Sequence, residues 1–354
     1  MKIKISSLVS ILSVVFLCSP VATQAQYETQ NNNYGVSGGN INDITRSFCC
    51  SGTLGSLVTG GGTFYILSNN HVLARQDQAA VGEAISQPGL IDNGCQAPRT
   101  VATFTAAPHL GTNVDCAIAA LRSGTMNTTG AIQGLNGGTG ATAPSTTTMA
   151  ATVGMAVQKS GRTTGHQTGN VGSINTSVNV QYQLQCGKGK KYTVSYTNQV
   201  VINSSTFSAG GDSGSLILTN TSCAHPVALL FAGSSSDTIG NPIRDVINAL
   251  GTAGHPVTFV GQNCTGPSSP QEGAQSFQLP QQALDRASKV LEQNRHELMS
   301  GPAVLGVGLG ALEDNSVPAV VVYVDKTSAT MPQLPVQIDN VPVRIKMTDP
   351  FIAY

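Results

Sequence analysis

The chain has 354 residues, which is enough for two or three domains with a sizeable core. Only 10% of the residues are charged and the formal net charge is zero, so nothing in the composition indicates a nucleic-acid surface or an acidic polymer as partner. Gly, Ser, Thr and Asn are plentiful and Trp is absent. This composition favours many short strands, joined by turns, over long helices.

The first 25 residues have the pattern of an export signal. Lys2 and Lys4 form a short basic end, residues 8–17 are mostly apolar, and the sequence TQA at 23–25 offers small residues for cleavage. The apolar run is too short for a comfortable membrane span, and no second stretch of that length follows. We therefore expect residues 1–25 to be removed, and the mature protein to be secreted or periplasmic without a stable membrane span.

Two other interpretations of this N-terminal segment are open. One is a retained N-terminal anchor. The other is a lipoprotein modified at Cys18, which is disfavoured because bulky Phe16 and Leu17 precede this cysteine where small residues are required.

The next part of the chain shows a succession of short apolar runs. Residues 26–48 are polar and are expected to form a loose lead-in. Runs at 52–58 and 63–68 are separated by three glycines, which predicts a hairpin. Similar runs follow at 100–105, 116–121, 155–159, 169–175, 178–183, 199–202, 215–218 and 226–232. Short strands at this spacing indicate an all-β barrel or sandwich, and residues 241–250 predict a short helix that closes the unit.

The last part of the chain has a different pattern. Residues 262–280 are rich in Pro, Ser, Gln and Gly and predict a linker. Residues 281–299 have helical periodicity, and strand-like runs follow at 304–309, 319–324 and 341–345. We expect a small α+β module over residues 281–354. It contains His296 but no recognisable catalytic set, so its role stays unknown, with a folding aid or a docking module as the preferred interpretation.

Export affects what the cysteines are expected to do. Removal of the signal would take Cys18 away and leave Cys49, Cys50, Cys95, Cys116, Cys186, Cys223 and Cys264. Disulfides are expected in an oxidising compartment, and the odd number leaves one thiol free. We expect bridges from Cys95 to Cys116 and from Cys186 to Cys223, each within one barrel. No metal-ligand spacing is present, so neither a structural zinc nor a cofactor is expected.

Three motifs place a histidine, an aspartate and a serine in the chain in that order. His71 follows an apolar run that ends in Ser-Asn-Asn, Asp115 precedes the strand-like CAIA, and Ser213 lies in the run GDSGS at 211–215. Each motif alone has a plain structural explanation, as a turn or a structural side chain. Hydrolytic enzymes of several folds combine the three residues, and this order is that of the chymotrypsin-like double β-barrel. The other histidines lack such context and are interpreted as structural or surface residues.

These residue types suit one reaction. A serine hydroxyl needs a base within hydrogen-bond reach, and that base needs a group that fixes its tautomer. Ser213 would attack a carbonyl, His71 would accept the proton, and Asp115 would orient His71. Gly211 would let the backbone turn so that its N–H and that of Ser213 point at the developing oxyanion.

With these motifs the chain resembles the trypsin-like, or chymotrypsin-fold, serine proteases. The segments YILSNNHVL at 65–73 and NVDCAI at 113–118 are similar to the family's histidine and aspartate segments, and 211–215 is similar to its nucleophile loop. KSGRTTG at 159–165 is similar to a second-barrel hairpin of secreted bacterial members, of the streptogrisin and α-lytic protease type. The match predicts a protease domain over residues 49–261.

A second resemblance is to bacterial relatives of the plant NAL1-like trypsin-like proteins. Similar runs are LFAGS at 230–234 and NPI at 241–243. The tail motif IDNVPV at 338–343 is also similar to a module of such relatives, whose role the match does not imply.

The resemblance implies an all-β double β-barrel followed by the small α+β module. It also implies a secreted serine endopeptidase that hydrolyses protein or peptide substrates through an acyl-enzyme intermediate. Two alternatives remain open: a non-catalytic homologue that binds a partner, and a serine hydrolase that acts on esters.

The chain departs from the family pattern in the positions of its disulfide cysteines. Cys50 matches the first cysteine of the family's histidine-loop disulfide, but the residue after His71 is Val72 and not the second cysteine, so this disulfide is missing. The cysteine that the family has near the nucleophile loop is also missing, because Ala209 stands in that region. The usual N-terminal activation sequence is absent. In bacterial relatives the aspartate beside the nucleophile pairs with a basic residue of the second-barrel hairpin. The resemblance therefore implies an ion pair between Asp212 and Lys159. It also implies that the enzyme does not require an activating cleavage.

Specificity is inferred from the family pattern as well. Phe207 is implied near the base of the primary pocket, with Gly233 and Ser234 on one wall. No acid lies at the base, so a preference for Lys or Arg is not expected. Bulky Phe207 would leave room only for small or medium apolar side chains.

Overall fold

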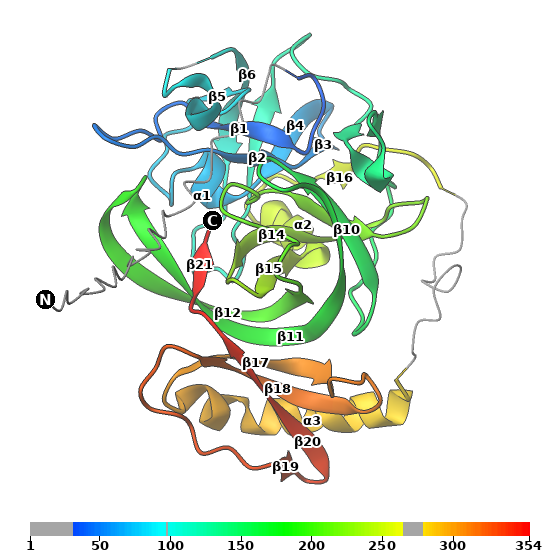
Figure 1. Ribbon diagram of the computed structural model, residues 1–354. Coiled ribbons are helices and arrows are strands. Elements are labelled where there is room, and N and C mark those ends of the chain that lie inside the picture. The colour runs from blue at the N-terminus through cyan, green and yellow to red at the C-terminus, as the bar shows by residue number, and fades with distance from the viewer. Residues whose placement is uncertain (1–30, 97, 265–278) are drawn as a thin grey trace, which may run out of the picture.

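The computed structural model describes residues 31–96, 98–264 and 279–354 (Figure 1). The expected export signal, Cys18 and most of the expected linker lie outside these residues. Two β-barrels lie one above the other, and a smaller unit of one helix and several strands packs beneath the second barrel. This arrangement confirms the predicted fold class.

The first barrel is built around a bent strand. Its strands are β1 (Val36–Asn40), β2 (Gly52–Leu54), β3 (Ser56–Gly60), β4 (Thr63–Ser68), β5 (Ala84–Ser86), β6 (Thr100–Ala106), β7 (Ala117–Leu121) and β16 (Thr258–Phe259). Only Gly55 separates β2, which pairs with β1, from β3, which pairs with β4. The two strands therefore act as one and close the ring β1–β2/β3–β4–β7–β6–β5. The predicted hairpin is confirmed in β3–β4, where Gly61 and Gly62 turn with positive φ.

The expected loose lead-in proves to contain a strand of this barrel. β1 is buried along its whole length and pairs with both β2 and β5. The polar composition was misleading because Asn40 buries its amide against specific partners: Nδ2 donates to the Leu73 carbonyl and to Glu83 Oε2, each at 2.8 Å. Buried polar groups with such partners cost little. The prediction is therefore wrong for residues 36–40, and the first barrel begins before residue 49.

The second barrel is closed by direct strand pairing. Its strands are β10 (Ala156–Gly161), β11 (Gly165–Gln185), β12 (Lys188–Asn203), β13 (Leu216–Thr219), β14 (Pro226–Gly233) and β15 (Asp237–Pro242). The ring runs β10–β13–β14–β15–β12–β11 and returns to β10. The two strands predicted at 169–175 and 178–183 form one 21-residue strand, β11. Together β11 and β12 extend beyond the barrel as a long ribbon (Figure 1).

The remaining elements of the two barrels are short. Within the first barrel these are α1 (Asn70–Leu73) and the 3-10 turn η1 (Leu90–Asn93). Between strands of the two barrels lie the hairpin of β8 (Ile132–Gln133) and β9 (Ala141–Thr142), the 3-10 turn η2 (Leu135–Gly137), and α2 (Ile243–Thr252). Helix α2 confirms the predicted closing helix. It buries Ile243, Val246 and Leu250 in the core of the first barrel, so it ties the end of the second barrel to the first.

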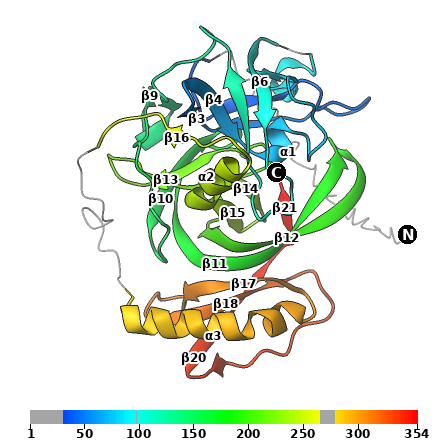
Figure 2. The ribbon, with the colours of Figure 1, turned by 180° about the vertical axis from the view of Figure 1, so that it is seen from behind.

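The C-terminal module continues the sheet of the second barrel. It consists of α3 (Gln281–Ser300), β17 (Val304–Ala311), β18 (Pro318–Asp325), β19 (Gln337–Ile338) and β20 (Val341–Thr348), followed by β21 (Phe351–Ala353). β17 pairs with β11, and α3 packs on β17 and β18 through an apolar face (Figures 1 and 2). β21 leaves the module and pairs with β11 and β14, which places the C-terminus between the barrels beside α1.

The disulfides differ from the expected pairs. Among the described residues, bridges join Cys49 to Cys95, Cys50 to Cys186, and Cys223 to Cys264. Both predicted pairs are therefore wrong. Cys116 is the free thiol, fully buried in the first core. The assumption that a bridge stays within one barrel failed because Cys186 lies at the tip of the β11–β12 ribbon, which reaches the first barrel.

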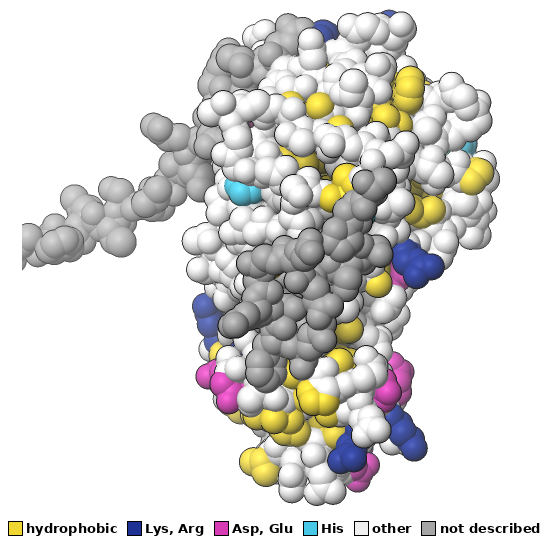
Figure 3. All heavy atoms as spheres, turned by 90° about the vertical axis from the view of Figure 1, so that its right-hand side faces the viewer, with side chains coloured by type: hydrophobic (Ala, Val, Ile, Leu, Met, Phe, Trp, Pro, Cys, Tyr) yellow, Lys and Arg dark blue, Asp and Glu magenta, His cyan; other side chains and the backbone are white. Residues whose placement is uncertain are grey.

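The surface carries few charges. On the face shown in Figure 3, charged side chains are sparse and most of those visible lie in the lower half of the molecule. Within the described residues, no helix combines the length and the apolar character that a bilayer crossing requires.

Candidate active site

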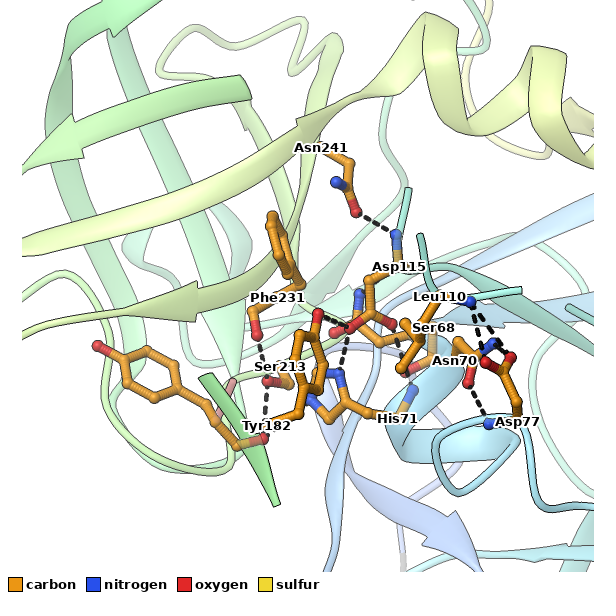
Figure 4. A network of polar contacts seen from close by, with 12 residues as sticks. Ser68, Asn70, His71, Asp77, Leu110, Asp115, Tyr182, Ser213, Phe231 and Asn241 are labelled. Carbon is orange, nitrogen blue, oxygen red and sulfur yellow. Dashed lines mark hydrogen bonds and ion pairs between the residues drawn. The ribbon is translucent and has the colours of Figure 1, made fainter. Parts of the chain in front are cut away.

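Two of the three predicted residues come from neighbouring strands of the first barrel. β4 leads directly into α1, which carries His71, and Asp115 lies just before β7. β4 and β7 pair with Ser68 opposite Ala117, so His71 and Asp115 each lie a few residues beyond the paired ends. The pairing therefore brings them together, as Figure 4 shows.

His71 and Asp115 form a short buried pair. His71 Nδ1 lies 2.6 Å from Asp115 Oδ2, and the His71 backbone N–H donates to Oδ1 at 3.2 Å. Burial alone would lower the pKa of His71, but the charge and hydrogen bond of Asp115, together with the Tyr354 backbone oxygen and the charge of Asp43, outweigh it, and the pKa is raised. Since Nδ1 faces the carboxylate, Nε2 is the nitrogen that is left to act as a base.

Asp115 has further partners that the sequence analysis did not identify. The Tyr182 hydroxyl donates to Asp115 Oδ2 at 2.8 Å and lies 2.7 Å from the Tyr196 hydroxyl. Burial raises the pKa of Tyr182 well above its ordinary value, so Tyr182 stays a donor. The backbone N–H of Asp115 donates to Asn241 Oδ1 at 2.9 Å. The only signal in the sequence was the group of tyrosines within residues 182–196, and that pattern alone is equally typical of core packing.

Ser213 lies where the two barrels meet. It is fully buried, and its carbonyl oxygen accepts a hydrogen bond from the Thr53 N–H of β2 at 2.7 Å. A Cβ at Gly55 would lie 1.8 Å from the Gly214 carbonyl oxygen, so only glycine allows the bent strand to approach the loop this closely. The first barrel thus fixes the backbone of the predicted nucleophile.

The serine hydroxyl and the histidine converge on one oxygen atom. Ser213 Oγ and His71 Nε2 each lie 2.9 Å from the backbone oxygen of Tyr354, the residue after β21. Ser213 Oγ also lies 3.2 Å from the Phe231 carbonyl oxygen. Within the described part of the chain, no direct hydrogen bond joins Ser213 to His71, because Tyr354 lies between them.

The loop before Ser213 presents two free backbone donors. Gly211 has a φ of +96°, and a Cβ there would lie 2.4 Å from Arg162 Nη1. The Gly210 carbonyl is turned away and accepts from Thr163 Oγ1 at 2.6 Å. Among the described residues, the N–H groups of Gly211 and Ser213 have no hydrogen-bond partner. Unpaired backbone donors beside a serine hydroxyl are the groups that an oxyanion site requires.

Asp212 and Lys159 form a buried ion pair beneath this loop. Their charged atoms are 3.1 Å apart, and both side chains are fully inaccessible to solvent. Asp212 also accepts from the backbone N–H groups of Thr163 (2.8 Å) and Ala209 (3.0 Å). Burial lowers the pKa of Lys159, and the charge of Asp212 opposes this effect. The pair ties the loop to the β10–β11 hairpin.

The expected pocket residues separate into two groups. Phe207 is fully buried in the core of the second barrel, where its ring lies against Gly169. Gly233 and Ser234, at the end of β14, border the side chain of Tyr354: its hydroxyl donates to the Ser234 carbonyl at 3.1 Å. A Cβ at Gly233 would lie 2.2 Å from that hydroxyl, so glycine is what makes this space available.

No metal site accompanies these residues. Within the described ranges, no group of three or more His, Cys, Asp or Glu side chains is placed to hold an ion. The arrangement holds a buried acid, a base, a hydroxyl and two backbone donors, which are the parts needed for acyl transfer through a serine.

Comparisons with known proteins give solved structures only. No protein-family model and no curated protein sequence matches the chain. A glutamic-acid-specific serine protease is 24% identical over 64% of this chain and 98% of its own, with a TM-score of 0.44. A Nocardiopsis protease is 16% identical over 64% and 98%, with a TM-score of 0.44. A Cellulomonas bogoriensis chymotrypsin is 18% identical over 66% and 100%, with a TM-score of 0.43.

Proposed function

We propose that the chain is an exported serine endopeptidase in which Ser213 is the nucleophile, His71 the general base and Asp115 the orienting acid. The observation that carries the proposal is the convergence of Ser213 Oγ and His71 Nε2 on one backbone oxygen, with Asp115 at 2.6 Å behind the imidazole. The disulfides among the described residues support an oxidising compartment, and hence a secreted or periplasmic location.

The proposed reaction follows from these positions. His71 Nε2 removes the proton of Ser213 as Oγ attacks the substrate carbonyl, and it then gives this proton to the leaving amine. Asp115 stabilises the imidazolium that forms between these steps. The N–H groups of Gly211 and Ser213 hold the oxyanion, and one such donor contributes roughly 10²–10³-fold in rate. Water then repeats the attack on the acyl-enzyme and releases the acid.

The test is labelling by a fluorophosphonate probe, which reacts with activated serines. We expect the label on Ser213, located by mass spectrometry, and its loss in Ser213→Ala. Because Tyr354 lies against Ser213, the experiment includes a protein that lacks residues 353–354. A folded, shortened protein that takes no label at Ser213 would favour the non-catalytic homologue instead.

Tyr182 supplies a second prediction, as a positioning residue. Tyr182→Phe removes the donor to Asp115 but keeps the ring, and a hydrogen bond to a charged group contributes about 1.5–3 kcal/mol. Not all of this reaches the transition state, so we expect kcat/KM to fall about tenfold. Asp115 would then interact more strongly with His71, so the acidic limb of the pH–rate profile should move to higher pH.

The control for Tyr182→Phe is Tyr65→Phe on β4, which should change neither quantity. If Tyr182 had only a structural role, Tyr182→Phe would lower the free energy of unfolding without moving the acidic limb of the pH–rate profile. An unshifted profile at full stability would contradict the proposed positioning.

A further inference from the structure

The end of the chain enters the candidate active site as an added strand. β21 pairs antiparallel with β14, with Ala353 opposite Ala232 and Ile352 opposite Gly233. The Tyr354 N–H then donates to the Phe231 carbonyl at 3.4 Å. Addition of an extended segment to an exposed sheet edge is a general mode of peptide recognition, in which the backbone gives affinity and pockets give specificity.

The backbone oxygen of Tyr354 lies between the nucleophile and the base. It is 2.9 Å from both Ser213 Oγ and His71 Nε2, so it holds by hydrogen bonds the two groups that would otherwise act on a substrate. It does not contact the free N–H groups of Gly211 or Ser213, among the described contacts. Residues 351–354, called the tail below, therefore lie in the candidate active site and engage Ser213 and His71 without using the two free backbone donors.

The side chain of Tyr354 fills a neutral, partly polar space. Its hydroxyl donates to the Ser234 carbonyl, and its ring packs on the core that contains Phe207. Burial raises the pKa of Tyr354 to about 12, so the hydroxyl is neutral at pH 7. The acids whose charge reaches this hydroxyl are Asp212 and Asp237, and each is already paired with a lysine. This space suits an uncharged aromatic side chain.

The C-terminal module fixes the approach of the tail. Phe351 is fully buried and packs edge-on against Tyr323 of β18, with ring centroids 5.8 Å apart. Thr348 Oγ1 lies 2.7 Å from Ser234 Oγ, and Asp349 pairs with Lys326 at 3.0 Å. Since β17 pairs with β11, the module is anchored on the barrel whose cleft the tail enters. The module thus has a definite task, which is to present residues 351–354.

We propose that the chain's own residues 351–354 occupy the cleft along residues 231–233 and inhibit the enzyme in competition with substrate. The substrates that this cleft takes carry tyrosine or phenylalanine in the space beside Gly233 and Ser234, directly before the scissile bond. This inference rests on the proposed function. It corrects the expectation of a pocket limited by Phe207 to small or medium side chains, because the space holds a tyrosine.

Tethering makes such inhibition effective. A ligand on a short tether has an effective concentration on the order of millimolar. If the free tail bound with a dissociation constant about ten times lower, the tethered tail would reduce the apparent activity by about tenfold.

The experiment compares the full chain with a protein that lacks residues 353–354, which keeps buried Phe351 in place, and with Tyr354→Ala. Fluorophosphonate labelling of Ser213 and hydrolysis of short peptides should be about tenfold faster in both than in the full chain. Tyr354→Phe should stay inhibited. Val336→Ala, at an exposed position of the module, should match the full chain. Among peptides that differ only in the residue before the cut, Tyr and Phe should exceed Ala, Lys and Asp by at least tenfold.

A binding measurement separates the two proposals. The fluorescent dipeptide Ala-Tyr, which copies residues 353–354 and so fills only the space that the truncation opens, is added to Ser213→Ala proteins with and without residues 353–354. We expect binding only to the shortened protein, and weaker binding when the final Tyr of the peptide is replaced by Asp. If Ser213 takes label but the full and shortened proteins react equally, the tail inference is overturned and the proposed function stands. If the peptide binds but Ser213 never takes label, the cleft binds peptides without cleaving them, and the catalytic proposal and the proposed inhibition both fail.

Discussion

Asp115→Asn is expected to lower kcat/KM for peptide hydrolysis by about 10⁴-fold while leaving the fold intact. The amide keeps the size of the carboxylate but presents a mixture of donor and acceptor to His71 Nδ1, so the imidazole no longer holds the tautomer that leaves Nε2 basic. It also removes the negative charge that would stabilise the imidazolium. The measurement is steady-state hydrolysis by the protein without residues 353–354, so that the tail does not limit the rate.

The pH dependence gives this prediction a second readout. Catalysis needs neutral His71, so activity appears as pH rises through the His71 pKa. Asp115 raises that pKa, and the substitution removes its charge. The acidic limb of the residual activity should therefore move to lower pH. Asp245→Asn on α2 is the matched control and should change neither quantity; a loss below tenfold in Asp115→Asn would contradict the role given to Asp115.

The sequence predicted correctly the elements that depend on neighbouring residues alone, namely turns and amphipathic helices. The glycines after β3 turn a hairpin because they adopt positive φ, and the periodicity of residues 281–299 matches α3 to within one residue. β1 was missed because its buried Ser37 and Asn40 look like loop residues in isolation. β11 was divided in two because irregular register around residues 171–178 interrupts the alternation along one continuous strand.

The candidate site was predictable only where short motifs carry it. His71, Asp115 and Ser213 lie in recognisable segments, and the structure brings the three together. Tyr182 and Tyr354 were missed because their contacts join residues 67 and 141 positions apart in the chain. Nothing in the tail sequence marks it as a strand of the cleft. The bridge between Cys50 and Cys186 escaped prediction for the same reason, since it depends on how far the ribbon extends.

The Asp212–Lys159 pair bears on how the nucleophile loop is held. Both side chains are fully buried, and Asp212 takes part in several hydrogen bonds of the loop. Removal of one partner from a buried pair costs about 3–5 kcal/mol, because an uncompensated charge stays inside. If this pair holds the nucleophile loop in place without help from an N-terminus released by cleavage, a protein with an added N-terminal tag should be as active as the untagged protein.

Lys159→Met tests this role, since it keeps the length of the side chain and removes its charge. We expect a loss of about 3–5 kcal/mol in the free energy of unfolding, together with a large loss of Ser213 labelling, because an unpaired Asp212 would pull the loop toward water. Urea unfolding and labelling measure the two effects. The double variant Lys159→Met/Asp212→Asn removes both charges and should recover much of the stability. Wild-type stability and labelling in Lys159→Met would show that the loop is held by its hydrogen bonds to Thr163 and Ala209 instead.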